Sequence, residues 1–97
     1  MTDTSSDPSA ETIAEAVQAI DGVHSLHGGL FGEVATYLPG GRVSGVRIGD
    51  DGVDVHIVVR MGRPVLPVAE AVRAAVEAIT VGPTHVTVED LADVTGD

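Results

Sequence analysis

The sequence contains no cysteine, no lysine and no tryptophan, and its large aromatic side chains are one phenylalanine and one tyrosine. Without cysteine the chain can form neither disulfides nor any site that needs a thiolate, whether catalytic or zinc-binding. Aromatic residues make up 2% of the chain and hydrophobic residues 43%. The core of a globular domain must therefore be built from valine, isoleucine, leucine and alanine.

Long hydrophobic runs are also missing. No run approaches the roughly 20 apolar residues that a bilayer-spanning helix needs. Residues 1–10, MTDTSSDPSA, lack the basic and apolar regions of a secretory signal. We therefore expect a cytoplasmic protein without direct membrane insertion.

Basic residues are few. The chain has five arginines and fifteen acidic side chains, which gives a formal net charge of −10. A long-range field of this sign repels nucleic acid and anionic lipid headgroups. The charge therefore predicts that the chain binds neither nucleic acid nor a membrane surface directly.

The 97 residues suit one domain. We expect a disordered acidic N-terminus over residues 1–9, a single domain over 10–91 and an acidic tail over 92–97. Apolar residues at spacings of three and four predict a helix over 10–20, capped by Ser9 or Asp7, and a second helix over 66–79.

Strand patterns fill most of the remaining chain. Residues 43–48 and 53–59 flank the turn GDDG and predict a β-hairpin, with Asp51 and Gly52 supplying the positive φ angles. Short strands are expected over 23–26 and 85–89, and the apolar spacing over 31–38 suggests one and a half turns of helix. The predicted class is α+β, a two-layer sandwich of a small mixed sheet with two main helices on one face.

Two motifs in the glycine-rich stretch between the first helix and the hairpin suggest a binding site. His24 and His27 could ligate a metal, but no third ligand lies near them in sequence, so we expect two strand-end polar residues. The run GGLFG contains the G-x-x-G of nucleic-acid-binding KH domains, but it carries no basic residue. Neither a nucleophile–base pair nor a phosphate-binding loop is present, so we expect no enzymatic activity and no cofactor.

The hairpin and the last strand predict a second kind of site. Alternation along these strands places polar side chains on the sheet face opposite the core. Arginines around one apolar residue, Val58, are typical of a protein interface. The predicted interaction surface comprises Arg47, Asp54, His56, Val58, Arg60, His85, Thr87 and Glu89.

The order of these segments resembles the alkaline-shock, envelope stress response protein family of bacteria. The resemblance rests on Gly22, Val23, Leu26, Gly28 and Gly29 after the first helix, on VRI and VDVHIVVRMG in the hairpin, and on PVAEAVRAAV leading into HVTVED. It implies a non-enzymatic cytoplasmic protein of cell-envelope homeostasis. Such a protein associates with itself and is held at the membrane by a small membrane-anchored partner.

Two alternatives remain open at this point. One is a metal-responsive binding module that uses His24 and His27, and the other is a KH-like nucleic-acid module.

Overall fold

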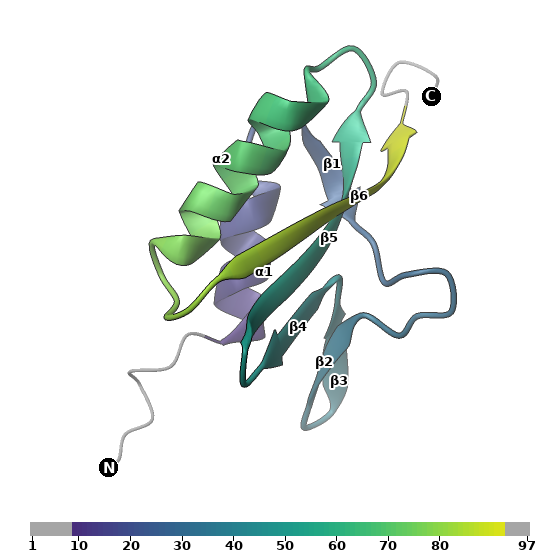
Figure 1. Ribbon diagram of the computed structural model, residues 1–97. Helices are drawn as coiled ribbons and strands as arrows, with labels where there is room; N and C mark the ends of the chain where they lie inside the picture. The colour runs from purple at the N-terminus through teal and green to yellow at the C-terminus, as the bar shows by residue number, and fades with distance from the viewer. Residues whose placement is uncertain (1–8, 93–97) are drawn as a thin grey trace.

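The structure of the protein is a computed structural model that describes residues 9–92. The elements in chain order are α1 (Ala10–Gln18), β1 (Val23–Leu26), β2 (Ala35–Leu38), β3 (Gly41–Ser44), β4 (Val46–Gly49), β5 (Gly52–Arg60), α2 (Val65–Glu77) and β6 (Thr84–Ala92) (Figure 1). The predicted α+β class is confirmed.

Both helices form where the apolar spacing predicts them. The side chain of Ser9 caps α1 by accepting a hydrogen bond from the Thr12 N–H at 3.1 Å, as expected of serine at this position. Ile13 and Val17 of α1 are fully buried. The second helix buries Val68, Val72 and Val76 at spacings of four residues.

The sheet is organised around β5. Along one edge of β5 lies β6, parallel to it from Val53 to Arg60. The antiparallel partners β4 and β1 share the other edge, where β4 pairs with Val53–Val55 and β1 with Ile57–Val59. Strands joined by a crossover helix are generally parallel, as β5 and β6 are, and the predicted β-hairpin is confirmed by β4 and β5.

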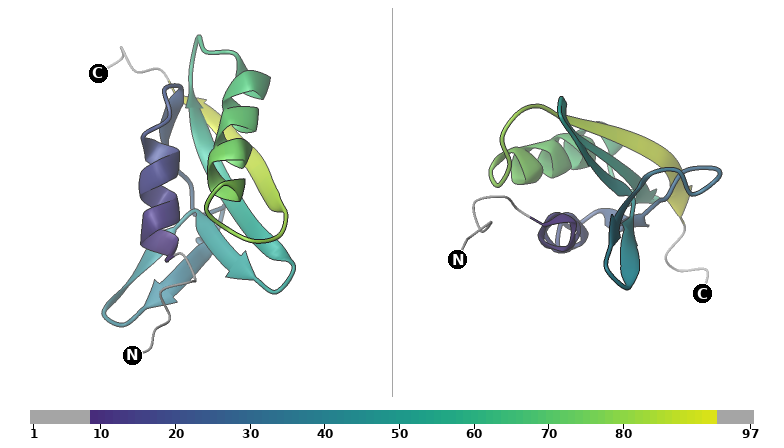
Figure 2. Two further views of the ribbon diagram at one scale, coloured as in Figure 1. Left: turned by 90° about the vertical axis from the view of Figure 1, so that its left-hand side faces the viewer. Right: turned by 90° about the horizontal axis from the view of Figure 1, so that it is seen from below.

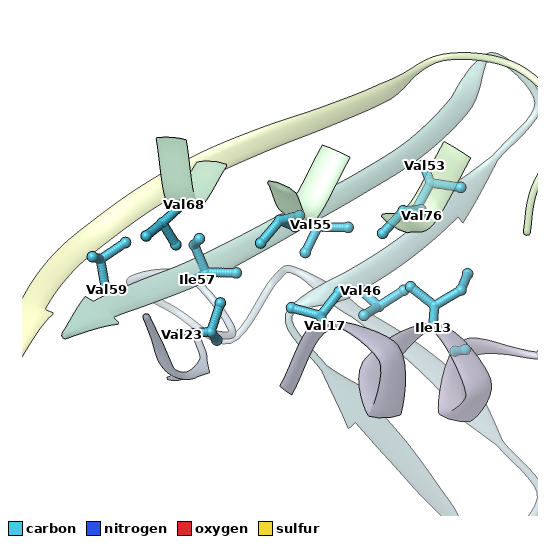
Figure 3. Close-up of a cluster of buried hydrophobic side chains, with 12 residues drawn as sticks. Ile13, Val17, Val23, Val46, Val53, Val55, Ile57, Val59, Val68 and Val76 are labelled. Atoms are coloured by element: carbon cyan, nitrogen blue, oxygen red, sulfur yellow. The ribbon is translucent and has the colours of Figure 1, made fainter. Parts of the chain in front are cut away.

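The core lies between the helices and one face of β5. Val53, Val55, Ile57 and Val59 alternate along the strand and are at most 3% exposed, as the period-two pattern predicts. They pack with the buried side chains of α1 and α2. Both helices lie in front of the strands in the left view of Figure 2. Figure 3 shows these valines and isoleucines meeting in one cluster.

The helical turn expected over residues 31–38 is wrong. Residues 35–38 form β2, which pairs with β3 as a separate two-stranded antiparallel sheet. The apolar spacing fits a helix, but Pro39 and Gly40 sit at the turn of this hairpin. Phe31 does not cover the core, since it is 87% exposed.

The first strand of the predicted hairpin is interrupted at Gly45. This glycine has φ +88°, and a Cβ placed on it would lie 2.7 Å from the Leu26 Cβ. The chain therefore changes partner here, with β3 pairing to β2 and β4 pairing to β5. In the following turn Gly49 pairs directly with Gly52, and the positive φ falls on Gly52 and not on Asp51, so the prediction is wrong for Asp51.

The predicted disordered N-terminus and acidic tail lie outside the described residues, apart from Ser9, which caps α1, and Ala92, which ends β6. Within residues 9–92 no helix combines the length and the apolar character needed to cross a bilayer.

Truncation of a core valine should destabilise the domain measurably. Val72 is fully buried, whereas Val81 is 95% exposed. We expect Val72→Ala to lower the free energy of unfolding by about 1.5 to 3 kcal/mol, because it removes two buried methyl groups and leaves a cavity. Val81→Ala is the matched control and should change it by less than about 0.5 kcal/mol. Urea unfolding followed by circular dichroism measures the free energy of unfolding of both variants. Equal effects of Val72→Ala and Val81→Ala would contradict the placement of Val72 in the core.

Candidate functional site

The sheet face that points away from the core cluster carries a row of polar side chains across three strands. Arg47 of β4 pairs in register with Asp54 of β5, and Asp54 pairs with His85 of β6. The Arg47 guanidinium lies 3.5 Å from the Asp54 carboxylate, with both side chains more than a third exposed. Solvent-exposed pairs of this kind contribute little to stability, so this row is a polar surface rather than a structural brace.

The next row holds a closer pair. The Nδ1 atom of His56 lies 2.6 Å from the Glu89 carboxylate, and the two side chains are only 20% and 26% exposed. The β5–β6 register shifts at this point, because Ile57 pairs with Val88 but Val58 pairs with Asp90. Glu89 is thus the extra residue of a β-bulge, a feature that redirects side chains. The bulge residue links the edge strand to the central strand through His56.

Two predicted members of this surface behave differently from the expectation. Val58 was expected to be an exposed apolar centre, but it is 7% exposed. Its neighbours in register are Ser25 of β1 and Asp90 of β6. Arg60 ends β5 half-buried and forms no ion pair within residues 9–92. The apolar contacts of an interface must therefore come from somewhere other than Val58.

A glycine-rich loop over residues 28–34 carries exposed apolar side chains. The Val34 N–H donates to the Gly28 carbonyl at 2.8 Å, and the Gly32 N–H donates to the Gly29 carbonyl at 3.2 Å. The Val34 carbonyl accepts in turn from the Gly45 N–H at 2.8 Å. These bonds fix a compact loop that carries Leu30 and Phe31 at its tip, 82% and 87% exposed.

Glu33 connects this loop to the polar rows. Its carboxylate accepts a hydrogen bond from the Phe31 N–H at 2.9 Å. Hydrogen bonds from its own N–H and from that of Phe31 hold the pKa of Glu33 below its ordinary value, and the charges of His56 and Arg47 act in the same direction. The loop therefore borders the surface that contains the His56–Glu89 pair.

The exposed aromatic residues are the part of the site that sequence reasoning missed. Tyr37 on β2 is 71% exposed, so both large aromatic side chains of the chain lie on the surface. The apolar spacing over 31–38 favoured a helix in place of this loop and strand. A usable signal was present in the glycines that flank Leu30 and Phe31, since glycines on both sides of an apolar pair favour a tight loop over a helix.

The two candidate metal ligands do not converge on a site. The Nδ1 atom of His27 accepts the Gly29 N–H at 2.9 Å, and the Nδ1 atom of His24 lies 3.1 Å from the Ser25 hydroxyl. Within residues 9–92 no group of three histidine or acidic side chains is arranged to hold a metal ion.

The other sequence motifs are also placed by the fold. The G-x-x-G of the glycine-rich loop joins β1 to β2, whereas in a KH domain this motif joins two helices. A shallow pocket of about 380 Å³ lies at the β4–β5 turn, lined by residues 47–52 together with Asp54 and His85. Its ionisable side chains are three carboxylates, one arginine and one histidine, which is not the donor set of a phosphate site.

Protonation of Glu33 should loosen the loop tip at low pH. The lowered pKa in the folded state means that the ionised carboxylate stabilises the loop above its unfolded-state pKa, and that this is lost as pH falls through the folded-state value. We therefore expect the Phe31 amide resonance to titrate with a midpoint below 4.5. Its protection factor against hydrogen exchange, taken relative to the intrinsic exchange rate at each pH, should fall below that midpoint. Glu33→Gln should abolish this titration. A midpoint at or above 4.5 would contradict the hydrogen bond.

Zinc and nickel should not bind specifically to His24 and His27. Isothermal titration of the chain and of the double variant His24→Ala/His27→Ala with each metal should give the same heat, because two separated imidazoles lack a third ligand. Saturable binding that the double variant loses would restore the metal-responsive alternative.

Comparison of the chain with protein-family models, with curated proteins and with solved structures finds no significant match.

Proposed function

We propose that the chain is a non-enzymatic interaction protein of the cell envelope. It acts at the inner face of the cell membrane, where it associates with itself and with a small membrane-anchored protein. The resemblance in sequence order supports the envelope context. One structural observation carries the interaction role: the large aromatic residues of the chain, Phe31 and Tyr37, are 87% and 71% exposed.

Exposed aromatic side chains are informative in this chain because the core does without them. Its fully buried large side chains are valines and isoleucines. Aromatic residues bury large areas and dominate the energetics of many protein interfaces. A phenylalanine beside a leucine at the tip of a fixed loop therefore suits contact with a partner protein.

The loop is ordered before any partner binds. Its internal hydrogen bonds and the Glu33–Phe31 contact hold Leu30 and Phe31 in place. Pre-ordering reduces the conformational entropy that binding would otherwise have to overcome. The neighbouring polar rows add hydrogen-bonding groups of both signs, as the rim of an interface commonly does.

The charge of the chain indicates the chemistry of the partner. With a net charge of −10, the domain is attracted to a basic surface and repelled by anionic lipid. A membrane-anchored partner with a basic cytoplasmic segment fits this field better than the lipid surface itself.

Truncation of the loop tip should weaken partner capture. Tagged protein is crosslinked in cells of its own host and recovered from the membrane and soluble fractions. We expect a small membrane-anchored protein to be recovered with the unaltered chain, and its recovery to fall at least tenfold with Phe31→Ala, because loss of an anchoring aromatic removes about 2 kcal/mol of binding free energy. Leu66→Ala on α2 is the control, since Leu66 is 76% exposed and distant in sequence from the loop. Recovery from the soluble fraction alone, without a membrane protein, would refute membrane association.

Charge reversal at the end of β5 should have a related effect. Arg60→Glu should weaken self-association, because it adds negative charge to copies that each already carry a net charge of −10 and repel one another. It should not lower the urea midpoint of unfolding, because Arg60 forms no ion pair within the described residues that its loss would break. Unchanged association of this variant would remove Arg60 from the interface.

A further inference from the structure

We propose that the free edge of β6 pairs with β6 of a second copy of the chain, antiparallel and symmetric about Thr87. This inference deepens the self-association part of the proposed function and rests on it. It names the surface and the residues through which two copies join.

Among the described residues β6 has β5 as its single neighbour in the sheet. It is nine residues long, whereas β1, β2, β3 and β4 have four residues each. One carbonyl on the edge of β4, that of Val46, already accepts a hydrogen bond from the Thr36 hydroxyl at 2.6 Å. The edge of β6 is thus the longest one open to pairing in residues 9–92.

The alternating hydrogen-bond pattern of the β5–β6 ladder identifies which backbone N–H and C=O groups of β6 point toward this free edge. The Val53 N–H donates to the Pro83 carbonyl at 3.0 Å, so Val53 bonds to residues 83 and 85 in the parallel pattern. His85 and Thr87 therefore direct their backbone groups toward β5. The alternate residues Thr84, Val86 and Val88 direct theirs toward the free edge.

Both ends of the open segment are closed by side chains. The Thr84 N–H donates to the Glu77 carboxylate at 3.3 Å, and the Leu91 N–H donates to the Asp90 carboxylate at 2.8 Å. The bulge at Glu89 ends the regular ladder between them. The middle of the strand has neither the lysine nor the proline with which exposed edges are often protected. The backbone groups of Val86 and Val88 are left available.

Two-fold symmetry and the alternation of backbone groups along β6 together select one register for the β6–β6 pair. A two-fold antiparallel pair can place Val86 opposite itself, Val86 opposite Val88, or Val88 opposite itself. The second register uses the edge groups of both valines on each copy and needs neither Thr84 nor Asp90. It forms about four interchain backbone hydrogen bonds.

This register also makes the side chains complementary. On the polar face, His85 lies opposite Glu89 of the second copy, a donor opposite a carboxylate. Val86 lies opposite Val88 on the other face, and Thr87 lies opposite itself. Because the surface complements itself, a second copy fits this edge better than an unrelated segment. The negative charge of each copy opposes the pairing, so added salt should favour it.

The absence of cysteine allows a direct test with single-cysteine variants. In the proposed register Thr87 is a non-hydrogen-bonded pair with itself, whose Cα atoms lie about 4.5 Å apart, within the range of a disulfide. We expect Thr87→Cys, under mild oxidation at micromolar concentration, to form a covalent dimer at least about tenfold faster than His85→Cys alone. A mixture of His85→Cys and Glu89→Cys should give mainly the mixed dimer. Circular dichroism of each variant checks that the fold is unchanged.

Sedimentation equilibrium of the unaltered chain, from about 10 µM to about 1 mM and at two salt concentrations, separates the inference from the function that it rests on. Dimers together with rapid Thr87→Cys crosslinking support the edge pairing. Dimers in which Thr87→Cys crosslinks no faster than His85→Cys overturn the edge pairing and leave self-association standing. A chain that stays monomeric and does not crosslink overturns both, while capture of the membrane-anchored partner is decided by the separate recovery experiment.

Discussion

The structure depends on one strand that is buried on one face and paired along both edges. β5 pairs with β6 along one edge and with β4 and β1 along the other. Four of its side chains, at residues 53, 55, 57 and 59, contribute to the cluster that both helices join. Without β5 the only ladder left among the described residues would be the β2–β3 pair. β-branched side chains suit this position, because they pack well on a pleated surface that is half buried.

Glycines at two positions allow other segments to approach β5 closely. A Cβ at Gly52 would collide with the Pro83 carbonyl oxygen, which accepts the first hydrogen bond of the β5–β6 ladder. A Cβ at Gly45 would lie 3.1 Å from the His56 carbonyl oxygen. Both residues also have a positive φ, which side chains other than glycine rarely adopt. Only glycine therefore fits sterically at residue 52, where the parallel ladder starts, and at residue 45, where the chain changes partner between β3 and β4.

Local sequence patterns predicted those elements in which the buried side chains recur with the period of a strand or a helix. The alternation in β5, the spacing of Val68, Val72 and Val76 in α2 and the aspartate–glycine turn all predicted the observed elements. The apolar spacing over residues 31–38 did not by itself resolve that stretch, because it is compatible with helix and strand alike. The structure there depends on contacts distant in sequence, such as the Gly45 N–H bond to the Val34 carbonyl.

The candidate site was predictable only in part for a related reason. Alternation tells which face of a strand a side chain occupies, and it correctly grouped Arg47, Asp54 and His85 in register. It does not tell how deeply that face is covered, and Val58 is buried on it. The His56–Glu89 contact depends on the bulge at Glu89, which no pattern in the sequence marks.

The exposure of the two aromatic residues is not explained by the stability of the domain. A domain whose core consists of valine and isoleucine would gain most from burying its largest apolar side chains, since the gain follows the apolar area removed from water. Phe31 and Tyr37 instead lie on a loop and a hairpin outside the core cluster. Hydrogen bonds hold the loop that exposes Phe31, so its exposure is a property of an ordered structure. The stability of the isolated domain gives no reason to keep a phenylalanine there, whereas the proposed contact with a partner does.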